Sequence, residues 1–85
     1  MRFLTRETFK APPTEEVRAL IPAEMAKVTE LTEQGLIAAV YVAADQSGAW
    51  MVWNVDSQAA LEEAHNTLPL HPYLNSEITV LAEEM

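Results

Sequence analysis

Three polar side chains in this sequence have the types and positions needed to move protons: Glu24, His71 and Tyr73. Glu24 lies near the middle of an apolar stripe in a helical pattern, so we expect its carboxylate to face the core. Burial raises the pKa of a carboxylate and makes it a usable base. A histidine titrates near neutral pH, and a tyrosine hydroxyl donates a hydrogen bond. Together these residues indicate acid–base chemistry.

His71 and Tyr73 belong to the segment 68–73, which reads Leu-Pro-Leu-His-Pro-Tyr. Its two prolines exclude a regular helix or strand, and its leucines are too apolar for a solvated linker. We therefore expect a rigid, partly buried joint that holds both polar side chains at the rim of a pocket. A purely structural joint is the alternative.

We also assign His65 and Trp53 to substrate binding. The helical pattern that follows a cap at Asp56 or Ser57 places His65 on the inward face of its helix. Trp53 ends a strand pattern that is apolar on both sides. The alternative is that His65 is a hydrogen-bonded core residue and that the tryptophan serves packing alone.

The opening residues 2–10 alternate as a strand does, with Arg2, Arg6 and Lys10 on one face. The other face carries Phe3, Thr5, Glu7 and Phe9. Three basic residues on one face make a local positive region, and we assign Arg6 and Lys10 to substrate binding. An edge strand protected by charge is the plainer interpretation.

The elements that must position these side chains follow in a simple order. After the first strand, a helix runs from Thr14 to Gly35 and either kinks or restarts at Pro22. Strands at 36–44 and 49–53, a second helix and a last strand through Ile78, Val80 and Leu81 complete the pattern, and we expect 83–85 to be a frayed end. This order predicts one α+β domain over residues 1–85, a ferredoxin-like βαββαβ sandwich.

The strands 36–44 and 49–53 are apolar on both sides, so we expect their hairpin at the centre of the sheet. Two helices cover only one face of a sheet, and a chain of 85 residues buries only about 60 to 65% of its unfolded surface. We therefore predict sheet-to-sheet pairing as a dimeric α+β barrel, in a homo-oligomer that is at least a dimer.

The composition narrows the partners. Thirteen acidic and five basic residues give a net charge of −8, which repels a phosphate backbone, so nucleic acid is not expected. The chain has no cysteine, so it has neither disulfides nor thiolate metal ligands. No apolar run is long enough to cross a membrane, and the first residues do not form a signal peptide. We expect a cytoplasmic protein with no membrane partner.

The segment 68–73 resembles the Leu-Pro-Leu-Phe-Pro-Tyr segment of the muconolactone delta-isomerases. The likeness extends along nearly the full chain and includes the Gly35 helix end, the turn at Val55 and Asp56, and Glu24, which stands where the family has a glutamate. The resemblance implies cofactor-free double-bond isomerisation in a lactone that carries a carboxylate, within aromatic catabolism, by assemblies as large as decamers. It implies no metal site.

This chain also differs from the family. The family has arginines on the strand after the glycine, whereas 36–44 has no basic residue, and His71 stands in place of a phenylalanine. Our leading hypothesis is therefore proton transfer on a small conjugated lactone or ketone, either double-bond isomerisation or a related cyclisation. Glu24 is its base, and His71 or Tyr73 its acid or oxyanion donor.

Two other hypotheses remain open. The first is a non-catalytic module for small-molecule binding or for assembly on the same fold, and it rests on the missing arginines. The second is a haem or oxygen-using relative, with His65 and His71 as the only imidazole ligands and no metal-ligand spacing.

Overall fold

The computed structural model describes residues 1–82, and the predicted frayed end at 83–85 lies outside the described residues. Within residues 1–82 there is one antiparallel sheet of four strands in the order β2-β3-β1-β4. The strands are β1 (Arg2–Phe9), β2 (Ile37–Val42), β3 (Gly48–Asn54) and β4 (Leu74–Leu81). The helices are α1 (Glu15–Arg18), α2 (Ile21–Glu33) and α3 (Gln58–His65), and η1 (His71–Tyr73) is one turn of 3-10 helix.

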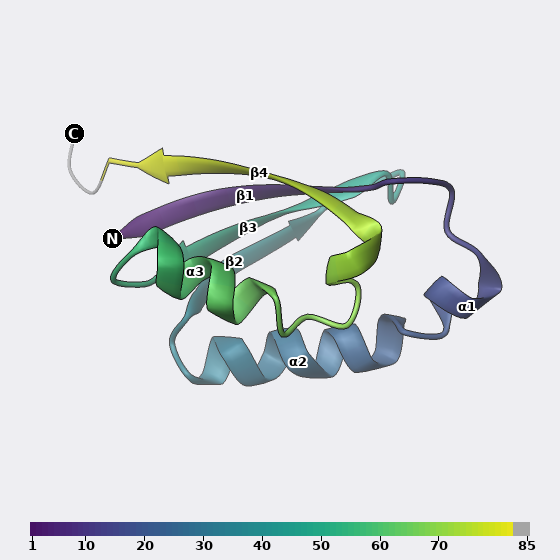
Figure 1. Cartoon of the computed structure of the whole chain (residues 1–85), viewed down its shortest axis with the longest axis horizontal. Coiled ribbons are helices and arrows are strands. Elements are labelled where there is room, and N and C mark those ends of the chain that lie inside the picture. The colour runs from purple at the N-terminus through teal and green to yellow at the C-terminus, as the bar shows by residue number, and fades with distance from the viewer. Residues whose placement is uncertain (83–85) are drawn as a thin grey trace.

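This arrangement is the predicted ferredoxin-like α+β fold. Helices α2 and α3 lie side by side on one face of the sheet, and the other face is open (Figure 1). The turn η1 stands between α3 and β4, so the polypeptide returns to the sheet edge beside the first strand. One layer of helices and one layer of strands therefore enclose the core.

The first predicted helix restarts instead of kinking. Thr14 caps α1, where its hydroxyl accepts a hydrogen bond from the Val17 N–H at 3.3 Å. A new helix, α2, then begins with Pro22 in its first turn, where a missing N–H costs nothing. Gly35 follows the end of α2 with a φ of +80°, a conformation that glycine adopts without strain.

The predicted position of the β2–β3 hairpin at the centre of the sheet is wrong. Strand β2 is an edge strand, and the central strands are β3 and β1. Two of its apolar residues, Tyr41 and Val42, are more than 60% exposed. The apolar pattern of 36–44 predicts a strand but not its place in the sheet. The strand order depends on β1 pairing with both β3 and β4.

The alternation predicted for β1 is present and sets the polarity of the two faces. Thr5 and Glu7 point to the helices and are buried, whereas Arg6 points to the open face and is exposed. Strand β3 approaches β1 very closely at Gly48, where a Cβ atom would lie 2.5 Å from the Glu7 carbonyl oxygen. Glycine at this position therefore lets β3 pair with the stretch of β1 that carries Glu7.

The core fills the space between the sheet and the two long helices. Its buried members are Phe3, Leu31, Ile37, Met51, Trp53, Val55, Leu61, Ala64 and Leu68. Ser57 alone caps α3 through its side chain, which accepts from the Ala60 N–H at 3.1 Å. Within residues 1–82, no helix is long and apolar enough to span a membrane.

Candidate functional site

A cavity of about 410 Å³ opens on the helix-covered side of the sheet, between α3, η1 and the strands β1 and β4. Its wall mixes apolar side chains with groups that donate, accept or titrate: Thr5, Leu61, Glu62, His65, Asn66, His71, Leu74, Ser76 and Ile78. The volume falls in the range of sites that hold small molecules. Both histidines of the chain contribute to this wall.

A buried carboxylate, an imidazole and a hydroxyl meet at this cavity. Glu7 from β1 is 4% exposed, and its Oε1 contacts Nε2 of His65 from α3. The Ser76 hydroxyl from β4 donates to the same Oε1 at 2.9 Å and lies 3.2 Å from His65 Nε2. An ionised Glu7 only accepts hydrogen bonds, so this network assigns the hydrogen of a neutral His65 to Nε2.

His71 reaches the same wall from the proline joint. Its ring meets the His65 ring edge-on, with the ring centroids 5.3 Å apart. The joint forms a turn closed by two backbone bonds, from the His71 N–H to Leu68 at 3.0 Å and from the Tyr73 N–H to Leu70 at 2.9 Å. Nδ1 of His71 is buried and has no hydrogen-bond partner within the described residues.

Glu24 lies behind the joint on α2 and is half-buried. Its Oε1 accepts a hydrogen bond from the Leu70 N–H at 3.0 Å. Burial raises the pKa of the Glu24 carboxyl; the Leu70 hydrogen bond and the nearby His65 act in the opposite direction, and Glu7 adds to the rise. Glu24 thus belongs to the same electrostatic group as Glu7 and His65, although it does not line the cavity wall.

Trp53 lies in the core beneath the cavity. It is fully buried, and its indole Nε1 donates to the Thr5 hydroxyl at 2.9 Å. The Trp53 ring centroid lies 6.0 Å from that of His65, so the indole supports the imidazole from the core side. Its contacts are with the protein, and it is not part of the cavity wall.

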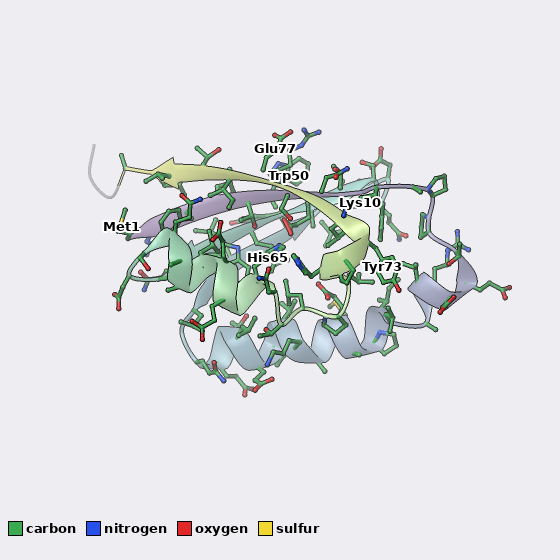
Figure 2. All side chains as sticks on the ribbon, in the orientation of Figure 1. Met1, Lys10, Trp50, His65, Tyr73 and Glu77 are labelled. Carbon is green, nitrogen blue, oxygen red and sulfur yellow. The ribbon has the colours of Figure 1, made fainter. Side chains whose placement is uncertain are left out.

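The other three residues of the predicted site stand apart from the cavity within one protomer. Arg6 is on the open face, opposite Trp50 and Glu77 in the strand register, whereas His65 lies between α3 and the sheet (Figure 2). Lys10 is exposed just after β1, and its backbone N–H donates to the Tyr73 carbonyl at 3.0 Å. Tyr73 is 37% exposed and is not part of the cavity wall.

The polar residues of the site that were not predicted are Thr5, Glu7, Glu62, Asn66 and Ser76. Thr5 and Glu7 carried a readable signal, because they share the face of the first strand with Phe3. Ser76 carried none, since its hydrogen bond to Glu7 joins positions 69 residues apart. Within residues 1–82, no three His, Asp or Glu side chains are arranged to hold a metal ion.

This protein has a ferredoxin-like α+β fold, as the sheet order and the helices on one face show. Its cavity, whose wall contains titratable side chains, is a candidate small-molecule site. The chain belongs to the muconolactone delta-isomerase family, whose model matches residues 1–84. The family resemblance noted in the proline segment is thereby confirmed.

Solved structures agree with this assignment. A crystal structure of muconolactone isomerase is 25% identical, with a TM-score of 0.85 over 99% of this chain and 91% of that chain. The 5-chloro-2-hydroxyhydroquinone dehydrochlorinase from Burkholderia phenoliruptrix, solved with 2,5-dihydroxybenzoquinone, is 12% identical, with a TM-score of 0.69 over 99% of this chain and 96% of that chain. The second likeness concerns the fold alone. No curated protein matches the chain by sequence.

Proposed function

We propose that this chain is a cofactor-free proton-transfer enzyme that shifts a double bond, or closes a ring, in a small conjugated lactone or ketone. The observation that carries the proposal is Glu24, a half-buried carboxylate held by the Leu70 N–H and raised in pKa by burial. Removal of a proton in conjugation with a carbonyl needs a base tuned toward neutral pH, together with a donor for the developing oxyanion.

The double-bond shift has two balanced steps. Glu24 takes a proton from a ring carbon in conjugation with the carbonyl, and the C–H electron pair moves into the conjugated system, which leaves the negative charge on the carbonyl oxygen. The protonated carboxyl then returns the proton to another carbon of that system. His71 is the better placed donor to the oxyanion, because it lines the cavity whereas Tyr73 does not. Glu24 lies behind the proline joint at Leu70, so the proposal requires the substrate to reach this carboxylate past that joint.

The basic residues Arg6 and Lys10 are proposed to bind substrate and not to transfer protons. Arg6 and Lys10 contribute to substrate binding only where a second copy brings them to a neighbouring cavity, since both side chains are exposed away from their own. We propose that copies pair through the open sheet face, which carries Trp50 and Tyr41 as exposed aromatic residues. The resulting assembly is at least a dimer.

The solved relatives support a small ring compound as the substrate. Their names place a muconolactone and a chlorinated hydroxyhydroquinone on this fold. We propose that this chain acts in the same general chemistry, the breakdown of aromatic compounds, in the cytoplasm. The non-catalytic binding module remains the second candidate, and the absence of basic residues on β2 favours it.

The test is double-bond isomerisation followed by NMR in deuterated water. The purified chain is supplied with muconolactone and, separately, with α-angelica lactone, a neutral butenolide in which the double bond moves between the same two positions in the opposite direction. We expect turnover with deuterium incorporation, and Glu24→Gln should lower the rate by roughly 10²- to 10⁴-fold while the assembly size stays unchanged. Glu33→Gln, an exposed charge change on the same helix, is the matched control.

Two outcomes go against this proposal. A full rate in Glu24→Gln removes this carboxylate from the mechanism. Binding of both lactones without isomerisation or deuterium exchange favours the non-catalytic module.

A further inference from the structure

The cavity brings three carboxylates near its contents and has no Lys or Arg in its wall among the described residues. Glu62 lines the mouth, Glu7 touches His65 from below, and Glu24 is close enough for its pKa to respond to both Glu7 and His65. The two histidines are the nearby groups that can become cations. The carboxylates near the cavity therefore outnumber the imidazoles, three to two.

Glu7 is the carboxylate of this group whose oxygens a ligand cannot readily reach to form an ion pair. Its side chain is 4% exposed, Oε1 is shared between His65 and Ser76, and Oε2 is buried with no hydrogen-bond partner within residues 1–82. A ligand carboxylate entering beside this group would lose water and meet no fixed cation of the same protomer, and both effects oppose its binding.

The neutral polar groups of the wall favour a different ligand. His71 is part of the wall, so its imidazole can accept from a ligand hydroxyl or donate to a ligand carbonyl. Leu61, Leu74 and Ile78 supply apolar surface for a ring. Among residues 1–82, this wall has hydrogen-bonding groups and apolar surface for a ring but no Lys or Arg.

We propose that the cavity selects an uncharged ring that bears a hydroxyl or carbonyl group over a ring that bears a carboxylate, and that Glu7 is the residue that sets this preference. The inference rests on the proposed function for the ring class of the substrate. The inference goes beyond the proposed function because it specifies that the substrate is uncharged and that Glu7 causes this preference.

Equilibrium binding of two unreactive probes tests the inference without any turnover. The probes are para-hydroxybenzyl alcohol and para-hydroxybenzoate, which share a ring and a hydroxyl and differ in charge. Their dissociation constants are measured at neutral pH, with the ring signals of His65 and His71 followed by NMR to locate the binding. We expect the neutral probe to bind at least about tenfold more tightly, which is the size of effect that one charge at close range produces.

Glu7→Gln keeps the shape and an acceptor for Ser76 while it removes the charge, so the preference for the neutral probe should shrink by about tenfold. Glu63→Gln removes an exposed charge from the same helix as His65 and should leave the preference unchanged. Glu62→Gln, at the solvent-exposed mouth, should shift the preference in the same direction by about twofold and keeps the test valid if Glu7→Gln does not fold.

Equal or tighter binding of para-hydroxybenzoate by the unmodified protein contradicts the inference, and so does a lack of binding of both probes. If Glu7→Gln and Glu63→Gln shift the preference equally, Glu7 is not its source. Efficient isomerisation of muconolactone over α-angelica lactone would overturn this inference while it supported the proposed function, so the two fail separately.

Discussion

The two faces of strand β1 differ in how far they bury charged side chains. On the helix-covered face, Glu7 is 4% exposed and meets His65 and Ser76. On the open face, one residue away, Arg6 pairs with Glu77 at 3.9 Å, and both side chains are more than half exposed. Alternation along one strand therefore separates a buried charge cluster from a solvated ion pair.

The difference shows where a charge can act on chemistry. A charge on the open face is screened by water and salt, and its pairing contributes little. A charge beneath the cavity acts through protein with little water between it and its neighbours, as the response of the Glu24 pKa to Glu7 and His65 indicates. In a single protomer, a charge on the helix-covered face is therefore better placed to act on a bound ligand than a charge on the open face.

The two tryptophans of β3 offer the strongest test of this comparison. Trp53 is 0% exposed and donates to Thr5, whereas Trp50 is on the open face and is 36% exposed. We expect Trp53→Ala to lower the free energy of unfolding by about 3–5 kcal/mol, because it leaves a cavity and an unpaired hydroxyl. Trp50→Ala should cost less than about 1 kcal/mol at low protein concentration.

Urea unfolding followed by circular dichroism measures both variants. If copies pair through the open face, the loss of unfolding free energy in Trp50→Ala rises with protein concentration. The loss in Trp53→Ala persists at low protein concentration, because it arises within one protomer. Equal costs for the two variants at low concentration would remove the distinction between the faces.

Much of the fold could be predicted because it depends on local signals. The alternation of β1 identified the face of Thr5 and Glu7, and the order of elements identified the ferredoxin-like topology. The helix break near Pro22 also followed from chemistry, because proline fits the first turn of a helix and not its middle. These features need only neighbours in sequence.

The site was less accessible to sequence reasoning because distant pairings create it. Ser76 reaches Glu7 only because β4 pairs with β1, and the edge position of β2 follows from the same pairings. Arg6 was assigned to substrate binding by its charge, whereas its strand register places it on the open face. Residue type suggested the chemistry, and long-range register decided which residues meet.

The second test concerns pH and follows from the raised pKa of Glu24. The folded protein binds the Glu24 proton more tightly than the unfolded chain, whose reference pKa is 4.5, so stability falls as pH rises from that value through the higher folded pKa. Glu24→Gln lacks this proton and keeps an oxygen acceptor for the Leu70 N–H. The free energy of unfolding of Glu24→Gln should therefore increase relative to that of the unmodified protein as the pH rises across this window.

Urea unfolding at several pH values between about 4 and 7 measures this gain, which should level off above the folded pKa. Arg6→Gln provides the open-face control, with no comparable change of its stability difference over the same window. A constant difference between Glu24→Gln and the unmodified protein would mean that Glu24 is as well solvated in the folded state as in the unfolded chain.

The smallest expected effect belongs to the Arg6–Glu77 pair on the open face. Since the two side chains are 53% and 75% exposed, we expect a coupling energy of roughly 0–0.5 kcal/mol in a double-mutant cycle of Arg6→Gln and Glu77→Gln. Urea unfolding at low and high salt measures it, and salt should reduce it further. A large coupling that grows with protein concentration would mean that a second copy covers the pair and removes its water, so that Arg6 is desolvated in the assembly although it is exposed in the protomer.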